Sequence, residues 1–477
     1  MHTPTRLALA MLGVVMAGAP TLSAQDAKPA AATPSATTPP NRDALVAQLD
    51  SIARNYLEEA PATGMSVAVV SHGDTLLLKG YGDRDRERHL AADVATVYRV
   101  GSITKQFTAA EVMRLVEKKK VRLDDPITKY LPQYPQWSAV TIRELLNHTS
   151  GIHSYTENAE WRKHWSEDLT PDSLVGFIAK DTLDFKPGTK WHYDNSGYML
   201  LGMLLEKVNK QPYAAQLERD FFKPLGMRTA AYCPSKPTDA RYAIGYSREE
   251  GTFKEATYLS MTHPYAAGAL CMSVSDFLRW QSALMRGKIV SPTSLALMTG
   301  PESLSSGAKT GYGMGLAPGK VGNHVTVQHG GSINGFSTQQ YWFPAESLSV
   351  VVFVSSEATN PDGLANNLAS AVLGLPVLPY KPPTVPLTAA DRAKYEGTYE
   401  IVTPDGNTMV VKLFSEGDTM MGQPEGQGKT PLRYIGDDTF GADFDASLRL
   451  RFKVDGGRAV GGTLEQRGAS MPVKRRP

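Results

Sequence analysis

The sequence predicts a protein of the α/β (α+β) class, with one large mixed domain and a small all-β module behind it. Alternating apolar residues typical of strands occur early, between Met65 and Tyr81, and return late, between Val325 and Val354, with helical periods between them. A proline-rich segment then ends this pattern, and short strand-like runs follow it. We therefore expect an antiparallel sheet flanked by helices, assembled from distant parts of the chain, and then a small antiparallel β-barrel.

The chain length and the net charge limit the number of domains and the kinds of partner that we expect. The chain has 477 residues, enough for about two or three domains. Its 50 Lys and Arg residues nearly balance 48 Asp and Glu residues, which leaves a formal net charge of +2. Because such a chain has no overall positive field to hold a polyanion, we expect no nucleic-acid partner.

The first 24 residues resemble a secretory signal peptide. Arg6 precedes an apolar run from Leu7 to Ala19, and a small-residue segment ending at Ala24 offers a cleavage site. An uncleaved anchor helix is the rival interpretation, but the run is shorter than the roughly 20 apolar residues that span a bilayer. We expect cleavage after Ala24, no membrane span in the remaining chain, and a periplasmic or secreted protein. Residues 25–42, rich in Ala, Pro and Thr, are expected to form a flexible linker.

Residues 43–375 form the expected large domain. An amphipathic helix is predicted over 43–58, and a strand hairpin follows between Met65 and Tyr81. Apolar periods predict further helices over 108–118 and 198–208, and further strands over 325–328, 338–343 and 348–354.

Residues 376–387 contain five prolines and are expected to be a second linker. Residues 388–477 then show the expected barrel pattern. Its strand-like runs are separated by Gly- and Asp-rich turns, and they cover 395–402, 409–414, 432–435, 448–454 and 461–466.

Ser102 and Lys105 are the first candidate catalytic residues. They are three positions apart where an apolar helix begins, so both side chains face the same way and the amine can reach the hydroxyl. A serine needs a nearby base to become a nucleophile, and a lysine with a lowered pKa can be that base. The same S-x-x-K spacing recurs at Ser306 and Lys309, but that pair lies in a Gly- and Ser-rich loop. The helical context favours Ser102.

Two further segments add groups that such chemistry uses. Tyr193 and Asn195 precede a predicted helix, where a phenol can shuttle protons and an amide can orient a lysine and a substrate carbonyl. The simpler interpretation of this pair is a buried aromatic and a helix cap. The later segment His329, Gly330, Gly331 and Ser332 ends a strand, where a substrate can lie against the backbone and the Ser332 amide can help to form an oxyanion hole.

Taken together and in this order, these motifs resemble the serine β-lactamase and penicillin-binding superfamily, whose signatures include S-x-x-K and K-T-G. The resemblance is greatest to class C β-lactamase-like proteins, the group of D-aminopeptidases, D-alanyl-D-alanine carboxypeptidases and esterases. Further segments of this kind are 141–152, 224–227 and 311–315. The resemblance implies a β-lactamase/transpeptidase-like fold, a lipocalin-like C-terminal barrel and an acyl-enzyme mechanism without a cofactor.

Position by position, the resemblance implies a role for each candidate residue. Ser102 is the acylated nucleophile, Lys105 its general base and Tyr193 a proton shuttle, although whether Lys105 or Tyr193 takes the serine proton stays open. Asn195 orients the substrate, and His329 begins the third motif.

A literal K-T-G at Lys309 is rejected as the third motif, because the expected pair of apolar strands follows His329 instead. A histidine in place of the K-T-G lysine is mostly neutral at pH 7, which makes efficient β-lactam hydrolysis doubtful. We therefore expect an exported serine hydrolase that acts on a small-molecule or peptide substrate with an amide or ester bond. The alternatives are a β-lactamase or DD-carboxypeptidase, and a non-catalytic ligand-binding protein that retains the fold.

The two cysteines, Cys233 and Cys271, are candidates for a disulfide in an oxidising compartment, and two buried free thiols are the alternative. Their separation does not fit a CxxC redox motif or a zinc site, and the histidines show no metal-ligand spacing, so no metal is expected. The sequence leaves the oligomeric state open.

Overall fold

The computed structural model describes residues 42–180, 182–236, 239–249, 252–379, 384–402, 408–425, 428–442, 445–466 and 469–476. The predicted signal peptide, and all of the predicted first linker except residue 42, lie outside the described residues. The α-helices are α1 (Arg42–Glu59), α2 (Thr104–Glu117), α3 (Ile142–Leu146), α4 (Pro171–Val175), α5 (Asn195–Asn209), α6 (Tyr213–Leu217), α7 (Tyr265–Gly268), α8 (Val274–Met285), α9 (Pro292–Thr299), α10 (Asp362–Leu373) and α11 (Ala389–Tyr395).

The strands of the large domain are β1 (Gly64–Ser71), β2 (Asp74–Asp85), β3 (Leu90–Ala91), β4 (Tyr98–Arg99), β5 (Ala231–Tyr232), β6 (Tyr246–Glu249), β7 (Thr252–Glu255), β8 (Leu270–Met272), β9 (Ala317–Val321), β10 (His324–Ile333), β11 (Phe336–Phe343) and β12 (Leu348–Val354). Those of the C-terminal module are β13 (Gly397–Val402), β14 (Thr408–Glu416), β15 (Thr419–Pro424), β16 (Thr430–Gly436), β17 (Thr439–Ala442), β18 (Asp445–Asp455), β19 (Arg458–Gln466) and β20 (Ala469–Arg475).

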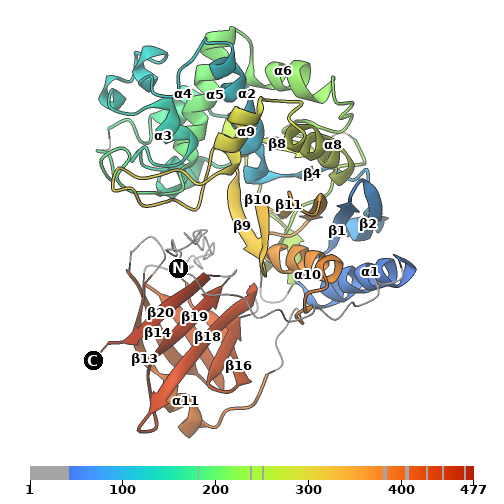
Figure 1. The fold of residues 1–477 in the computed structure, drawn as a ribbon, viewed down its shortest axis with the longest axis vertical. Helices are drawn as coiled ribbons and strands as arrows, with labels where there is room; N and C mark the ends of the chain where they lie inside the picture. Colours follow the sequence, from blue (N-terminus) through green and yellow to red (C-terminus); the bar gives the residue numbers. More distant parts are fainter. Residues whose placement is uncertain are drawn as a thin grey trace, which may run out of the picture.

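A seven-stranded antiparallel sheet with the order β3-β2-β1-β12-β11-β10-β9 lies between the helical region and the pair of helices α1 and α10 (Figure 1). Its centre joins the two ends of the domain, since Met65 on β1 pairs with Val354 on β12. Alternate residues of β12 face opposite sides: Val350, Val352 and Val354 pack with α1 and α10, whereas Val351 and Phe353 pack with the helical region. The predicted fold class is confirmed.

Helix α2 runs through the middle of the helical region and is buried on nearly all sides. Its Phe107 stacks on Trp280 of α8, with ring centroids 3.9 Å apart. Because α2 is buried on nearly all sides, its first turn, which carries Lys105, and the 3₁₀ turn before it, which carries Ser102, are held in place by the surrounding helices.

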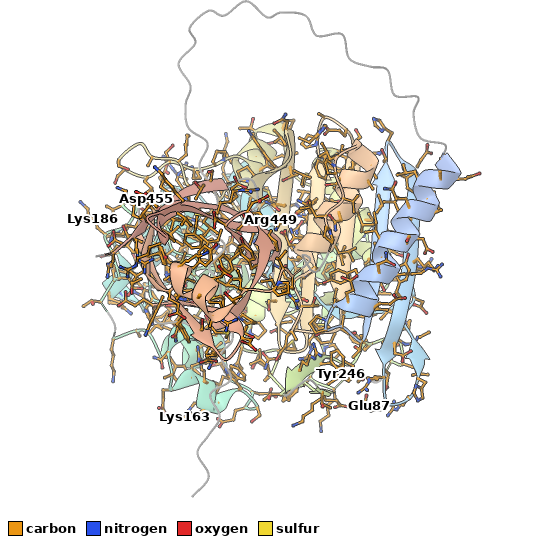
Figure 2. All side chains as sticks on the ribbon, turned by 90° about the horizontal axis from the view of Figure 1, so that it is seen from below. Glu87, Lys163, Lys186, Tyr246, Arg449 and Asp455 are labelled. Atoms are coloured by element: carbon orange, nitrogen blue, oxygen red, sulfur yellow. A yellow bond between two sulfur atoms is a disulfide. The ribbon has the colours of Figure 1, made fainter. Side chains whose placement is uncertain are left out.

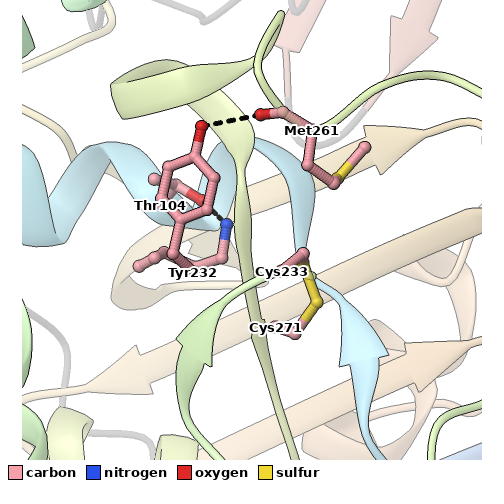
Figure 3. Close-up of a disulfide and its surroundings, with 6 residues drawn as sticks. Thr104, Tyr232, Cys233, Met261 and Cys271 are labelled. Atoms are coloured by element: carbon pink, nitrogen blue, oxygen red, sulfur yellow. Dashed lines mark hydrogen bonds between the residues drawn. A yellow bond between two sulfur atoms is a disulfide. The ribbon is translucent and has the colours of Figure 1, made fainter. Parts of the chain in front are cut away.

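A small sheet, β4-β8-β5, lies beside this helix and carries a disulfide between Cys233 and Cys271 (Figure 3). The Cα atoms of the two cysteines are 5.1 Å apart. Tyr232, next to Cys233, donates a hydrogen bond from its hydroxyl to the Met261 carbonyl at 2.8 Å. The hairpin β6-β7 forms a separate edge of the domain, where Tyr246 donates a hydrogen bond to Glu87 (Figure 2).

The C-terminal module is a closed barrel of eight antiparallel strands, β13 to β20, and it lies below the sheet domain in Figure 1. Figure 2 looks toward this barrel, whose interior is filled by side chains such as Phe440 and Phe452. The interpretation of Tyr395 as the start of a strand is wrong, because it ends helix α11 and its ring packs on Phe440 at 4.9 Å. Strands β15, β17 and β20 were not expected.

No helix in the described part of the chain is long and apolar enough to cross a membrane.

Candidate active site

Ser102 lies on a single 3₁₀ turn, Gly101–Ile103, that leads directly into α2. Gly101 has a left-handed φ of 51°, which glycine adopts without strain, and a Cβ atom there would lie 3.0 Å from the backbone N and O of Ser332. Across this contact, on β10, a Cβ atom on Gly331 would lie 2.1 Å from the Val100 carbonyl oxygen. The two glycines therefore allow the serine turn to pack directly on β10.

Lys105 is fully buried one helical turn after Ser102. Its Nζ donates hydrogen bonds to Ser102 Oγ (3.1 Å), Asn195 Oδ1 (2.8 Å) and the Ala267 carbonyl oxygen (2.9 Å). Burial lowers the pKa of Lys105 to about 7, and the charge of Asp194 opposes this shift. A lysine near half-protonation that touches a serine hydroxyl can accept its proton at neutral pH.

Tyr193 and Asn195 lie where α5 begins. Asp194 caps this helix, because its carboxylate accepts the backbone N–H groups of Ser196 and Gly197 at 2.6 and 2.9 Å. Burial raises the pKa of Asp194 to about 7. The Tyr193 ring lies below the Lys105 ammonium, with Nζ 4.7 Å from the ring centroid.

The Tyr193 hydroxyl is buried and has no hydrogen-bond partner among the described residues. Burial raises its pKa above the usual 10, and the neighbouring Ser102 partly offsets this rise. The phenol is therefore close to the nucleophile and protonated, a state in which it can give a proton to a departing group.

His329 is turned into the protein rather than into solvent, with 6% of its surface exposed. Its Nε2 shares a hydrogen bond with the Tyr312 hydroxyl at 2.8 Å, and its Nδ1 lies 2.5 Å from the Gly330 carbonyl oxygen. Burial lowers the pKa of His329 to about 4, and the Lys105 charge acts in the same direction. The imidazole is therefore neutral at pH 7 and supplies no positive charge for a substrate carboxylate.

The structure thus brings together Ser102, Lys105, Tyr193, Asn195 and the segment from His329 to Ser332. The other S-x-x-K pair, Ser306 and Lys309, lies in an exposed loop. There Lys309 donates a hydrogen bond to Ser303 and does not contact Ser306 as Lys105 contacts Ser102.

Several residues of the site were not singled out from the sequence. Thr156 Oγ1 accepts a hydrogen bond from Asn195 Nδ2 at 3.2 Å, and the Ala267 carbonyl receives Lys105. A backbone carbonyl leaves no mark in a sequence, so Ala267 could not have been found. Tyr312, by contrast, lies in segment 311–315, and the resemblance of this segment to the family could have indicated that Tyr312 belongs to the site.

A hollow of about 380 Å³ is lined in part by the residues that precede Tyr193 in the chain. Its lining is Glu157, Asp184, Phe185, Lys190, Trp191 and His192. Across the described ranges, no group of three or more His, Cys, Asp or Glu side chains has the arrangement to hold a metal ion.

A serine in contact with a buried lysine, beside an antiparallel sheet flanked by helices, is typical of serine hydrolases with the β-lactamase/transpeptidase-like fold. The chain belongs to the beta-lactamase family, whose family model matches residues 49–375. PbpX of Bacillus subtilis (strain 168), named as a penicillin-binding protein, is 32% identical over 286 residues, which cover 59% of this chain and 69% of PbpX. Protein flp of Staphylococcus aureus (strain N315) is 31% identical, over 43% of this chain and 42% of its own length.

Solved structures are similar over a larger share of the chain. The octameric penicillin-binding protein homologue from Pyrococcus abyssi has a TM-score of 0.65 and 26% identity, over 90% of this chain and 100% of that one. A D-stereospecific amidohydrolase from Streptomyces sp. has a TM-score of 0.61 and 26% identity, over 71% of this chain and 100% of that one.

Proposed function

We propose that this serine hydrolase cleaves an amide, peptide or ester bond through an acyl-enzyme on Ser102. The observation that carries the proposal is the contact of a buried, half-protonated Lys105 with the Ser102 hydroxyl at 3.1 Å. Lys105 takes the serine proton as the hydroxyl attacks the substrate carbonyl, and Tyr193 passes a proton to the leaving group. Water then attacks the ester carbonyl and releases the acid.

The remaining groups bind the substrate in this proposal. The Ser102 and Ser332 amides stabilise the oxyanion, and Asn195 holds Lys105 in place while its side chain faces the acyl group. His329 favours substrates without a carboxylate beside the scissile bond, because it is neutral and occupied by Tyr312. The likeness to a D-stereospecific amidohydrolase supports aminoacyl amides as the first substrates to test. The predicted signal peptide supports action outside the cytoplasm.

Penicillin binding or DD-carboxypeptidase activity is the second candidate, favoured by the 32% identity to PbpX. These activities require recognition of a substrate carboxylate, for which the third motif supplies no cation here.

The test is hydrolysis of one panel by the wild type, Ser102→Ala and Ser306→Ala. The panel contains nitrophenyl esters, D- and L-aminoacyl anilides, D-Ala-D-Ala peptides and a chromogenic cephalosporin. We expect turnover of esters or anilides to vanish in Ser102→Ala and to persist in Ser306→Ala, whose serine belongs to the exposed S-x-x-K loop. Mass spectrometry should find the acyl group on the Ser102 peptide of the wild type. Turnover that survives in Ser102→Ala contradicts the proposal, and a strong preference for the cephalosporin selects the second candidate.

A further inference from the structure

His148 lies at the centre of an aromatic cluster behind the candidate active site. It follows α3, is 1% exposed, and has a left-handed φ of 64°, which is uncommon for a residue with a side chain. Its ring lies 4.4 Å from the Tyr193 ring and 4.7 Å from the Tyr312 ring, measured between centroids.

The contacts of His148 bracket Tyr193 on both sides. The His148 carbonyl oxygen accepts the backbone N–H of His192 at 3.0 Å, and its Nδ1 accepts the backbone N–H of Asp194 at 3.1 Å. The residues before and after Tyr193 are therefore both bound to His148, while the His148 ring packs against the ring between them. Within the described ranges, no other residue accepts hydrogen bonds from the backbone on both sides of Tyr193.

His148 must be neutral for this arrangement, since Nδ1 needs its lone pair to accept the Asp194 N–H. Burial lowers the pKa of His148 well below 6.5, and the charge of Lys105 lowers it further. The proton then sits on Nε2, which has no hydrogen-bond partner within the described residues. A buried polar atom without a hydrogen-bond partner lowers the stability of the folded protein. The presence of a histidine at position 148 therefore needs a reason other than stability.

We infer that His148 is a positioning residue that fixes Tyr193 toward Ser102 and the leaving group. The inference rests on the proposed function, in which Tyr193 carries the leaving-group proton. It follows from the geometry because the Tyr193 hydroxyl has no hydrogen bond of its own to define its direction. The phenol is therefore aimed by its backbone and by ring packing, and His148 supplies both.

Two substitutions separate the two kinds of contact. His148→Asn keeps a short acceptor for the Asp194 N–H and tolerates the left-handed backbone, but it removes most of the ring. His148→Phe keeps a ring against Tyr193 and loses the acceptor. Val352→Ala, in the core on the far side of the sheet, is the control for lost stability without contact with Tyr193.

The measurement is kcat and KM for a nitrophenyl ester and an anilide of the same acyl group, corrected for the folded fraction. Nitrophenolate leaves without a proton, whereas an aniline must be protonated, so misplacing Tyr193 should affect the anilide more. We expect both His148 variants to lower the anilide-to-ester ratio of kcat by about tenfold or more, with smaller changes in KM. Val352→Ala should leave the anilide-to-ester ratio unchanged. A ratio that is unchanged in the His148 variants as well overturns the inference.

The same ratio is then measured for Tyr193→Phe alone and combined with each His148 variant. If His148 acts through Tyr193, the second substitution should lower the ratio little further. The other outcome is that Tyr193→Phe lowers the ratio and the added His148 substitution lowers it again by the same factor as in the wild type. That result overturns the inference, while the proposed function stands. A normal ratio in Tyr193→Phe removes Tyr193 from leaving-group protonation, and both the proposed role and the inference fail.

Discussion

Lys105 has three neutral hydrogen-bond acceptors and no carboxylate among them. This arrangement satisfies the donors of an ammonium without adding the negative charge that would hold its proton. Burial therefore dominates the pKa of Lys105 and moves it close to neutral pH. A group of this kind exchanges its proton with little change in free energy, which suits a residue that must take and return one in each cycle.

This property predicts the pH dependence of the reaction. The free amine is the reactive form, so kcat/KM should rise with pH through about 7. The Asp194 charge raises the pKa of Lys105, so Asp194→Ser should move this rise to lower pH, and serine still caps α5. Rates of ester hydrolysis between pH 5 and pH 9 are the measurement, with unfolding followed in parallel. A rise that stays in place in Asp194→Ser would show that Asp194 does not act on Lys105.

Ser102, Lys105 and Asn195 could be chosen from the sequence because helical spacing and motif order predict their contacts. The partner of His329 could not be predicted, because Tyr312 reaches it through tertiary packing and no local spacing encodes that contact. His148 lies in the family-like segment 141–152, but no role was predicted for it there. Its role as an acceptor depends on a left-handed backbone, which a sequence pattern does not show.

At the scale of elements, the site depends on how closely the turn Gly101–Ile103 approaches β10. The contact is between backbones, because Gly331 faces the Val100 carbonyl oxygen and Gly101 faces Ser332. Side chains at either glycine would separate the nucleophile from the strand that offers the Ser332 amide. The site therefore spans two segments that are far apart in the sequence. Their backbones approach each other directly, and the Thr338 hydroxyl donates to the carbonyl oxygens of both Val100 and Gly331.

Gly331→Ala should thus affect catalysis more than folding. Its Cβ would lie 2.1 Å from the Val100 carbonyl oxygen, so the serine turn must shift. We expect kcat/KM to fall by at least about tenfold, since small displacements of catalytic groups are costly, with a loss of stability of about 1–3 kcal/mol. Gly422→Ala, on barrel strand β15 with its nearest contact at 3.2 Å, is the matched control. Kinetics and thermal unfolding of both variants test this, and full activity in Gly331→Ala would show that the close approach is dispensable.

The elements of the sheet domain that were predicted, such as α1, β1, β2 and β12, have long and regular periods, whereas short elements such as α3, β4 and β8 were not predicted. The missed barrel strands are different: β17 has only four residues, and β15 contains adjacent methionines and a glycine. Such strands are defined by their neighbours in the closed barrel more than by their own alternation. Local patterns therefore indicated a barrel without giving all its strands.

At the scale of the whole molecule, the barrel has a hydrophobic core of its own, separate from the two cores on either side of the large sheet. Contact between the two parts involves α10 and β18, together with the segment before α11, where Val385 N–H bonds the Tyr434 carbonyl. Separate cores with a small contact are expected to unfold as separate cooperative units.

We therefore predict two transitions in scanning calorimetry. Phe440→Ala opens a cavity in the barrel core, where Phe440 is fully buried, and should cost about 3–5 kcal/mol. The barrel transition should fall by roughly ten degrees or more, while the other transition and ester hydrolysis stay unchanged. A single transition that shifts as a whole would mean that the two parts unfold together.

The pairing of β1 with β12 also bears on how the chain is made. Gly64 and Ser355 are bonded although they are 291 positions apart, so the centre of the sheet cannot close until almost the whole domain has been synthesised. Until then β1, which is largely buried on both faces in the folded domain, can pair only with β2, and its other edge is open to association with other chains. A ribosome making this protein thus exposes the open edge of β1 early and the strand that covers it only about 280 residues later, and a chaperone that binds the chain during synthesis would protect that edge.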